Sequence, residues 1–374
     1  MLSPLEKIDK AIRATDLDAL ACRHSANQAN YITPQDPFIE PLILSYKSNL
    51  QYCSGYTNLS AGRTLRSVFG ERKLPLINRG TYLRTKLIDQ VTEEFIKQFD
   101  VCQILSLGGG SDTRGFRFLE KFERVIYHEI DFPESTKIKK VAILRNEKLK
   151  SIVESQGESV DITSKEQFQQ LSPNLHTKRY HLQSYDLRKL SSGLTSEDVI
   201  PLLKHFDSSL PTLVLSECVL CYASPSENEE IIKFWKHQCR GLVSFLIYEP
   251  MSLNDSFGAT MTKNLLQRGI NLQTFNELPD LNSRLVFLSD ICGLSHIKLT
   301  NMSDVGGYVI YSSSKKPWIE VSDMKRINKL EFIDEVEEIK LLFEHYCLCY
   351  AESSPGDITF EGVNEVRWES DDWS

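Results

Sequence analysis

The chain has 374 residues, of which 41% are hydrophobic and 25% are charged, and it carries a formal net charge of −8. This length and composition fit one large or two ordinary globular domains with a sizeable core. Lys and Arg do not cluster, so no nucleic-acid-binding surface is predicted. No apolar run approaches the roughly 18 residues of a membrane span or forms a signal core, so we expect a cytoplasmic protein, with the nucleus as the alternative.

The first hundred residues are predicted to be mainly helical. Apolar residues fall near helical spacing in residues 1–30, which predicts one or two helices there. Residues 31–75 carry several prolines and glycines and are expected to form loops with short helices. A longer helical pattern follows at 81–99. We therefore assign residues 1–100 to an N-terminal helical cap or lid.

From residue 101, strand and helix patterns alternate, which predicts an α/β fold with a mainly parallel, seven-stranded, Rossmann-like sheet. This α/β core would occupy 101–350, with a polar insertion near 151–175, and an acidic tail at 351–374 is expected to be mobile. The expected strands are 101–107, 124–130, 179–185, 211–216, 242–248 and 307–312. The expected helices are 112–121, 133–150, 226–239, 254–268 and 327–349.

A glycine turn follows the first of these strands. Gly108 and Gly110 occupy the first two glycine positions of a dinucleotide-binding turn, but Thr113 stands at the third. Ser111 and Asp112 offer N-cap chemistry for the next helix, and Asp112 would place a negative charge where a pyrophosphate sits. The turn therefore favours a cofactor without phosphates, of which S-adenosylmethionine is the common one, over a nicotinamide dinucleotide.

Acidic residues stand at the carboxyl ends of four predicted strands, where ligands of open α/β sheets bind. They are Asp131, Asp186, Glu217 and Glu249. Asp131 follows the glycine turn by about 20 residues, the spacing at which a carboxylate meets ribose hydroxyls. Asp186 and the backbone of Leu187 could bind adenine, and Glu217 could favour the cationic sulfonium. Each carboxylate could instead cap the following helix.

The methionine carboxylate of this cofactor needs a cation. Arg84 and Arg23 are both candidates, although composition alone would place either at the solvated surface. The eight histidines form no cluster at ligand spacing, and Cys218-x-x-Cys221 lacks a second pair at zinc spacing. No metal site is therefore predicted, and the nine scattered cysteines are expected to be reduced.

Several segments together resemble the leucine carboxyl methyltransferase family. The matching stretches are 77–85, 107–113, 129–133, 216–222 and, more weakly, 343–347, and the resemblance spans about 15–350. The family methylates the C-terminal leucine carboxylate of the catalytic subunit of type 2A protein phosphatases. The segments Asn78-Arg79-Gly80 and Glu217-Cys218-Val219-Leu220 are fairly specific, whereas many methyltransferases share the glycine turn.

The resemblance implies a role for individual residues. Arg84 would hold the methionine carboxylate, Gly108 would allow close approach of the backbone, and Asp131 would accept the ribose hydroxyls. Asp186 and Leu187 would bind adenine. Glu217 and Arg23 would lie at the amino-acid end of the cofactor, Arg23 in place of a lysine of the family. The segment 151–175 and the tail after about residue 355 go beyond the family pattern.

The predicted reaction is an in-line methyl transfer to a carboxylate, which is already ionised near neutral pH and needs no general base. The protein's task is then positioning and desolvation. Candidate donors to the substrate carboxylate are Tyr222, Arg79 and Arg117. A tightly held cation would lower the reactivity of the nucleophile, so Tyr222 is favoured for direct contact.

Three other functions compete with this hypothesis. A small-molecule O-methyltransferase shares the glycine turn, a nicotinamide oxidoreductase is disfavoured by Thr113, and a non-catalytic protein could keep the cofactor fold. A related branch that modifies tRNA carries a repeat propeller, and this chain has no repeats. The expected partner is the phosphatase catalytic subunit, with no nucleic acid and no membrane. We expect a monomer.

Overall fold

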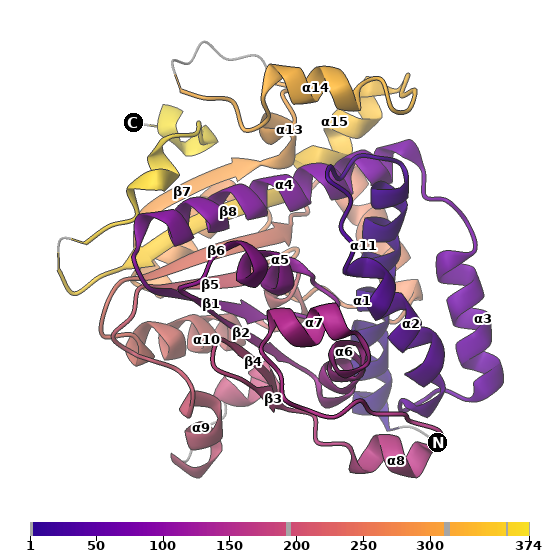
Figure 1. Cartoon of the computed structure of the whole chain (residues 1–374). Helices are drawn as coiled ribbons and strands as arrows, with labels where there is room; N and C mark the ends of the chain where they lie inside the picture. Colours follow the sequence, from indigo (N-terminus) through magenta and orange to yellow (C-terminus); the bar gives the residue numbers. More distant parts are fainter. Residues whose placement is uncertain (1–2, 192–195, 310–314, 357, 374) are drawn as a thin grey trace. The chain divides into compact units, whose positions relative to one another are not determined.

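The computed structural model describes residues 3–191, 196–309, 315–356 and 358–373 (Figure 1). Its contacts divide the chain into two compact units. The first unit comprises Met1–Thr81 and Gly108–Asp186, and the second comprises Tyr82–Leu107 and Leu187–Ser374. Each unit is described in turn.

The first unit begins with helices. They are α1 (Pro4–Gln28), α2 (Ile39–Asn49), a short 3-10 turn η1 (Leu50–Tyr52), α3 (Asn58–Phe69) and the first residues of α4 (Pro75–Gln98). Helix α1 begins with a capping box, in which the Ser3 N–H donates to Glu6 Oε2 at 2.7 Å and the Glu6 N–H donates to Ser3 Oγ at 3.3 Å. The apolar pattern predicted in residues 1–30 is thus one long helix.

The same unit holds three strands, in the order β3-β4-β2. Strands β2 (Val125–Asp131) and β4 (Tyr180–Ser184) are parallel, with Asp131 opposite Ser184, and β3 (Leu175–His176) is antiparallel to β4. The helices of this part are α5 (Arg114–Lys121), α6 (Pro133–Arg145), α7 (Glu147–Ile152) and α8 (Lys165–Gln170). Parallel pairing places the carboxyl ends of β2 and β4 at one edge.

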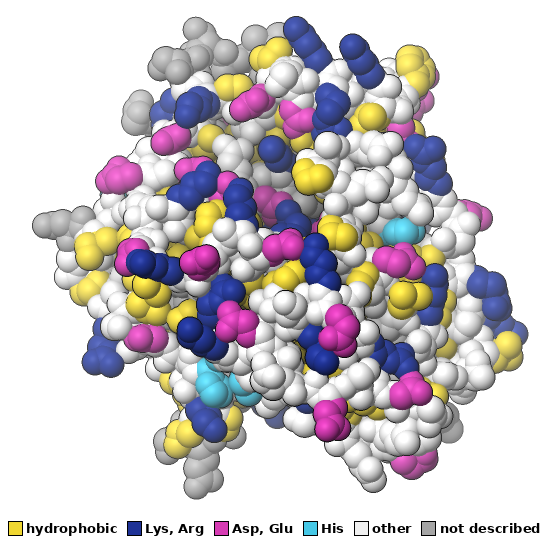
Figure 2. Space-filling view, in the orientation of Figure 1, with side chains coloured by type: hydrophobic (Ala, Val, Ile, Leu, Met, Phe, Trp, Pro, Cys, Tyr) yellow, Lys and Arg dark blue, Asp and Glu magenta, His cyan; other side chains and the backbone are white. Residues whose placement is uncertain are grey.

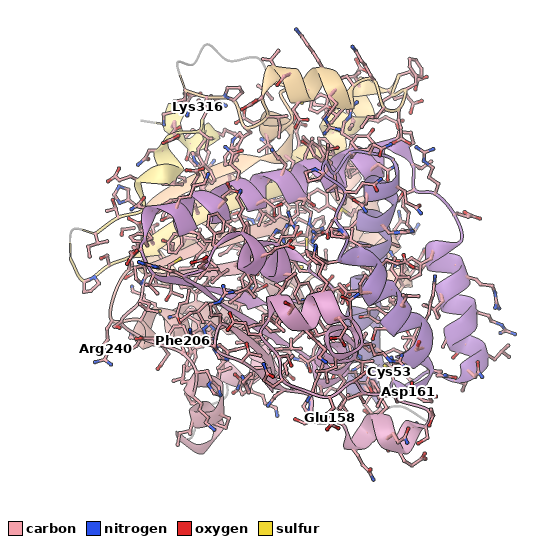
Figure 3. All side chains as sticks on the ribbon, in the orientation of Figure 1. Cys53, Glu158, Asp161, Phe206, Arg240 and Lys316 are labelled. Atoms are coloured by element: carbon pink, nitrogen blue, oxygen red, sulfur yellow. The ribbon has the colours of Figure 1, made fainter. Side chains whose placement is uncertain are left out.

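The predicted insertion at 151–175 is only partly a surface excursion. Phe168 of α8 and Ile162 are buried in the same apolar cluster as residues of α1, α2 and α6, and the rings of Phe168 and Tyr52 are 6.2 Å apart. Glu158 and Asp161 of this segment are exposed and are labelled in Figure 3. Apolar residues spaced through a polar stretch therefore attach it to the core.

The second unit contains five strands in the order β1-β5-β6-β8-β7. Strands β1 (Cys102–Leu107), β5 (Thr212–Glu217) and β6 (Val243–Pro250) run parallel. Strand β8 (Tyr346–Ser353) is antiparallel to both β6 and β7 (Ser295–Asn301). Every residue of β1 and β6 is buried, as expected of strands covered on both faces.

The remaining helices belong to the second unit. They are η2 (Leu187–Ser191), α9 (Ser196–Leu203), η3 (Leu220–Tyr222), α10 (Pro225–Gln238), α11 (Ser256–Gln267), α12 (Leu281–Val286), η4 (Phe287–Ile291), α13 (Met302–Val305), α14 (Val321–Ile327), α15 (Val336–Glu344), η5 (Glu361–Asn364) and η6 (Glu369–Asp372). Helix α10 begins at Pro225, a residue favoured at the first helical position. Ser224, the N-cap, forms a capping box with Glu227, and together these features define where the helix begins.

The α/β class with parallel strands and flanking helices is confirmed, but the count of seven strands is wrong, because the described residues form eight. The predicted helix 327–349 is wrong at both ends, since α15 begins only at Val336 and residues from Tyr346 onward form β8. That strand is buried between β6 and β7 and therefore reads as a continuous apolar run. The predicted strand 307–312 is also wrong at 307–309, and residues 310–312 lie outside the described residues.

The prediction of a mobile acidic tail does not hold for the described residues. Residues 351–353 belong to β8. Trp368 is fully buried, packs edge-on against Trp318 with ring centroids 4.9 Å apart, and donates from Nε1 to Val363 O at 2.8 Å. Arg367 Nη1 donates to Asp304 Oδ1 at 2.5 Å. Buried tryptophan and paired charge outweigh the acidic composition that suggested a free tail.

The displayed surface carries basic and acidic side chains interspersed (Figure 2). Within the part of the chain that the structure describes, no helix is long and apolar enough to span a membrane.

Candidate active site

The glycine turn takes a backbone conformation that side chains rarely allow. Gly108 and Gly110 have φ angles of 60° and 39°, in the left-handed region that favours glycine. A Cβ at Gly110 would lie 2.5 Å from Oδ1 of Asp16. The turn is fixed to β2 by a hydrogen bond from the Gly109 N–H to Ile130 O at 3.2 Å. The sequence-based prediction of a tight turn is confirmed here.

Asp131, at the end of β2, is bound to this turn. Its Oδ2 accepts the Gly110 N–H and its Oδ1 accepts the Phe132 N–H, both at 2.6 Å. Burial, and the negative charge of Asp16, raise the pKa of Asp131 to about 6, against the opposing effect of these two hydrogen bonds. A carboxylate has about four acceptor sites, so Asp131 keeps capacity for further donors, such as hydroxyls.

Asp16 of α1 is a residue of this region that sequence reasoning missed. Its Oδ1 accepts the Ser111 N–H and its Oδ2 accepts the Ser111 hydroxyl, both at 2.7 Å. The Tyr46 hydroxyl also donates to Asp16. Ser111 therefore binds α1 and does not cap α5, contrary to the prediction. Nothing in the local sequence around Asp16 links it to a turn 95 positions away.

Asp112 is surrounded by cations. Arg23 Nη1 and Arg114 Nη1 donate to its two oxygens at 2.6 and 2.7 Å. Burial favours the neutral acid, but Arg114, Arg23 and Lys139 outweigh it and hold the pKa of Asp112 far below its usual value. The predicted repulsion of a pyrophosphate by Asp112 is thereby weakened, because two arginines compensate its charge.

Arg23 itself is buried, and its second terminal nitrogen donates to Thr113 Oγ1 at 2.9 Å. It also lies 3.6 Å from Asp36. Its charge is therefore compensated within the first unit. A contact from Arg23 to a cofactor stays a prediction.

Glu129, one of the residues in the family-like stretch, lies in the core beneath the turn. Its side chain is 1% exposed, pairs with Lys139 and accepts the Tyr180 hydroxyl at 3.1 Å. Burial raises the pKa of Glu129 to about 7. A Cβ added at Gly109 would lie 3.1 Å from the Glu129 Cβ, so any side chain at position 109 would be crowded by Glu129. Its role is structural support of the turn.

In the second unit, the structure brings Arg84 and Glu217 into direct contact. Arg84 Nε on α4 donates to Glu217 Oε1 at the end of β5. The guanidinium lies over the Tyr248 ring, 4.9 Å from its centroid. The two side chains remain 26% and 19% exposed. A cation beside an anion is complementary to an amino-acid head group, which presents a carboxylate beside an ammonium.

The segment after Glu217 is a strained turn. Cys218 has a φ of 55°, unusual for a residue with a side chain, and its N–H donates to Tyr248 O at 2.8 Å. Burial raises the pKa of Cys218 to about 12, so its thiol stays neutral. Tyr222 ends η3 and is half-buried.

Among the described residues, no group of three or more potential metal ligands comes together.

The other predicted site residues are placed as follows. Asp186 lies just after β4 in the first unit and is half-buried, and Leu187 begins η2 in the second unit. Arg79 is a buried residue of α4. Arg117 of α5 lies 3.6 Å from Asp36 Oδ2. The ligand contacts predicted for these residues stay predictions.

Comparison with known proteins decides the family. The family model described as "Leucine carboxyl methyltransferase" matches residues 11–236. The chain belongs to the leucine carboxyl methyltransferase family. Proteins named leucine carboxyl methyltransferase 1 are 59% identical in Debaryomyces hansenii, over 98% of this chain and 99% of that protein, and 30% identical in Bos taurus, over 98% and 96%.

A solved structure, described as a putative methyltransferase from Thermobifida fusca, matches with a TM-score of 0.46 and 10% identity, over 83% of this chain and 94% of the other. Membership in the leucine carboxyl methyltransferase family confirms the predicted enzyme class. The chain is a methyltransferase that uses S-adenosylmethionine. The oxidoreductase and the non-catalytic protein are thereby set aside.

Proposed function

We propose that this enzyme methylates the C-terminal leucine α-carboxylate of the catalytic subunit of type 2A protein phosphatases and forms a methyl ester. The observation that carries the proposal is the near-full-length similarity to proteins named leucine carboxyl methyltransferase 1, at 59% and 51% identity in two yeasts. The identity of the proposed substrate, the phosphatase catalytic subunit, is what the family resemblance implies. A small-molecule O-methyltransferase of the same fold is the alternative outcome of the test.

The proposed cofactor contacts follow the residue roles that the family resemblance implies. Arg84 would bind the methionine carboxylate and Glu217 the ammonium group, a pairing supported by their direct contact. Asp131 would accept the ribose hydroxyls with the acceptor sites that Gly110 and Phe132 leave free. Gly108 would allow the backbone to approach. The remaining assigned contacts are Asp186 and Leu187 to adenine, and Arg23 at the amino-acid end.

The chain's part in the reaction would be positioning and exclusion of water. When bound, S-adenosylmethionine supplies a methyl group on a cationic sulfur. The Tyr222 hydroxyl would donate to the substrate carboxylate and orient it. A phenol suits this task because it leaves more charge on the nucleophile than an ion pair would. Arg79 and Arg117 are the alternative donors.

The deciding experiment incubates the purified enzyme with methyl-labelled S-adenosylmethionine and the phosphatase catalytic subunit, either intact or lacking its C-terminal leucine. We expect base-labile label on the intact protein only, because a methyl ester hydrolyses in base and the acceptor is the terminal carboxylate. No label on either protein, with binding of S-adenosylhomocysteine retained, would favour the small-molecule methyltransferase.

A matched variant sharpens the assignment of the donor. Tyr222→Phe removes only the hydroxyl and should lower kcat for the phosphatase while the Kd of S-adenosylhomocysteine stays unchanged. Unchanged turnover would remove Tyr222 from the mechanism.

A further inference from the structure

The short segment between Glu217 and α10, residues 218–222, is held by side chains from outside it. Its backbone combines the left-handed Cys218 with the 3-10 turn η3. Such a conformation costs free energy and persists only where the surroundings enforce it. The segment joins two residues of the proposed site, Glu217 and Tyr222, so what enforces its shape also sets their positions.

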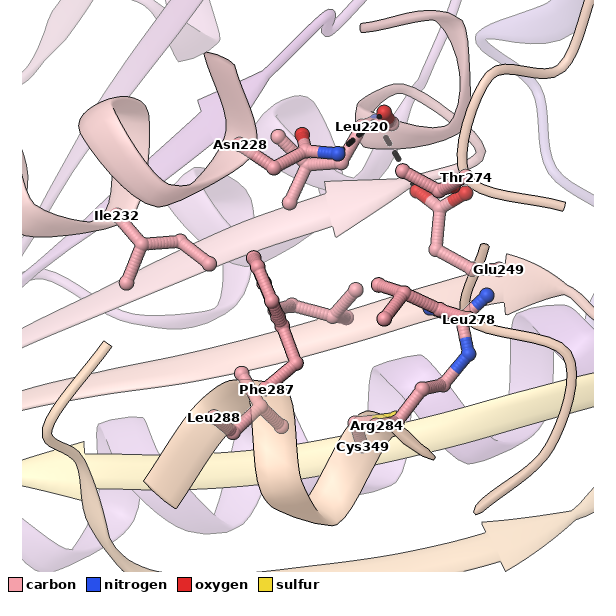
Figure 4. A pocket seen from close by; sticks show the side chains of 11 residues that line it. Leu220, Asn228, Ile232, Glu249, Thr274, Leu278, Arg284, Phe287, Leu288 and Cys349 are labelled. Carbon is pink, nitrogen blue, oxygen red and sulfur yellow. Dashed lines mark hydrogen bonds between the residues drawn. The ribbon is translucent and has the colours of Figure 1, made fainter. Parts of the chain in front are cut away.

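Both backbone groups of Leu220 are bound by buried side chains (Figure 4). Its N–H donates to Glu249 Oε1 at 3.0 Å, and its carbonyl accepts Asn228 Nδ2 at 2.9 Å. Glu249 Oε1 also accepts the Val219 N–H at 3.1 Å. Glu249 at the end of β6 and Asn228 of α10 are 1% and 2% exposed. The segment is thus clamped from two separate elements.

A second layer of polar groups stands behind the clamp. Glu249, Asn228, Thr274 and Arg284 line a cavity of about 20 Å³ within the second unit, with room for about one water molecule. Four buried atoms of these residues have no hydrogen-bond partner among the described residues: Glu249 Oε2, Asn228 Oδ1, Thr274 Oγ1 and Arg284 Nε. Two of them are acceptors, one is a donor and one can be either.

Electrostatics favours the same arrangement. Burial raises the pKa of Glu249, while Arg284, the Cys221 thiol and the two backbone N–H groups oppose that rise. Arg284 is itself buried and donates from Nη2 to Pro250 O at 2.9 Å. A buried carboxylate that faces a buried guanidinium is retained at a cost in desolvation. Apolar side chains at these positions would fill the core without this desolvation cost, so the retained charges call for another explanation.

We propose that Glu249 and Asn228 are positioning residues, which act through the segment 218–222 to hold Glu217 and Tyr222 where cofactor and substrate meet them. This inference rests on the proposed roles of Glu217 and Tyr222. Glu249 and Asn228 would touch neither cofactor nor substrate. Neither the fold nor the chemistry of methyl transfer requires a buried carboxylate at position 249, and the proposed positioning role explains why one is present.

The test uses two variants of the full-length enzyme. Asn228→Leu removes the donor to the Leu220 carbonyl at similar volume, and Glu249→Gln keeps an acceptor oxygen but removes the charge opposite Arg284. We expect each to raise the Kd of S-adenosylhomocysteine by about tenfold, because a small displacement of a binding group is costly. Isothermal titration calorimetry measures the Kd, and steady-state kinetics separate kcat from KM.

The matched control is Thr274→Val, which alters the same cavity but has no hydrogen bond to the segment among the described contacts. It should change the melting temperature and leave the Kd within twofold. If Asn228→Leu also keeps the Kd within twofold, the clamp is merely structural and the inference is wrong; this variant decides should Glu249→Gln not fold. Binding needs no phosphatase, so weakened binding without leucine methylation would defeat only the proposed function.

Discussion

The candidate cofactor-binding residues of the two units differ in their chemistry. In the first, the Asp131 carboxylate accepts two backbone N–H groups, and burial together with the nearby Asp16 carboxylate raises its pKa. In the second, Arg84 and Glu217 form an ion pair, and the Arg84 guanidinium lies over the Tyr248 ring. The first arrangement suits neutral hydroxyl donors, whereas the second suits a zwitterion. The ion pair should therefore be the more sensitive to substitution.

Removing the Arg84 cation of the second unit should have the largest effect on cofactor affinity. Arg84→Met deletes the partner of the methionine carboxylate and leaves Glu217 without its cation. We expect the Kd of S-adenosylhomocysteine to rise by about a hundredfold, since truncating one member of a partly buried charge pair costs about 2–5 kcal/mol. Calorimetric titration measures it. The control is Arg240→Met, an exposed arginine of the same unit (Figure 3), and an equal loss there would contradict the assignment.

Substitution of the glycine turn should come next. Gly110→Ala places a methyl group 2.5 Å from Asp16 Oδ1 at a φ of 39°. We expect a loss of about 2 kcal/mol in the free energy of unfolding, together with weaker cofactor binding. Chemical denaturation measures the first. Gly356→Ala meets nothing within 4 Å and should be neutral; if both variants are equally stable, the turn is not constrained as described.

Neutralising Asp131 of the first unit should weaken cofactor binding less. Asp131→Asn keeps the shape but exchanges one acceptor for a donor, which faces either the Gly110 or the Phe132 N–H. We expect the Kd of S-adenosylhomocysteine to rise by about tenfold, the worth of one charge-assisted hydrogen bond. Asp161→Asn, an exposed residue of the same unit, provides the comparison. A larger effect here than at Arg84 would reverse the order inferred for the two regions.

The smallest expected effect is a pH dependence of cofactor affinity that arises from Asp131 of the first unit. The pKa of Asp131 is about 6, so protonation on acidification removes acceptor sites for the ribose. If only the ionised form binds well, affinity should fall by about fourfold between pH 7 and pH 5.5. Asp131→Asn should flatten this dependence. If the dependence persists in the variant, it belongs to another group, of which Glu129, with a pKa of about 7, is the first candidate.

The sequence predicted what local pattern encodes. The glycine turn, the strand end at Asp131 and the alternation of strands with helices all follow from spacing along the chain. Asp16 could not be found this way, because its contact with Ser111 spans 95 positions. The pairing of Arg84 with Glu217 spans 133 positions and was not predicted, although the sequence proposed each residue separately as a cofactor contact. Contacts of this kind depend on tertiary packing, which periodicity does not record.

The C-terminal part shows the opposite failure, in which local pattern was misleading. Tyr346–Ser353 has the apolar content of a buried helix, yet it lies between two strands as β8. The acidic residues near Trp368 suggested a free tail, yet Asp371 pairs with Lys298 and Lys315 and Trp368 is buried. Composition describes the average solubility of a segment, whereas two or three well-placed contacts decide whether it packs.

The most direct test of the central claim, that Arg84, Glu217 and Asp131 are cofactor-binding residues, is a crystal structure of the full-length enzyme with S-adenosylhomocysteine. We predict that the ligand's carboxylate contacts Arg84, its amino group lies beside Glu217 and its ribose hydroxyls donate to Asp131. A ligand that contacts the Arg84–Glu217 pair but not Asp131, or Asp131 but not the pair, would contradict the claim.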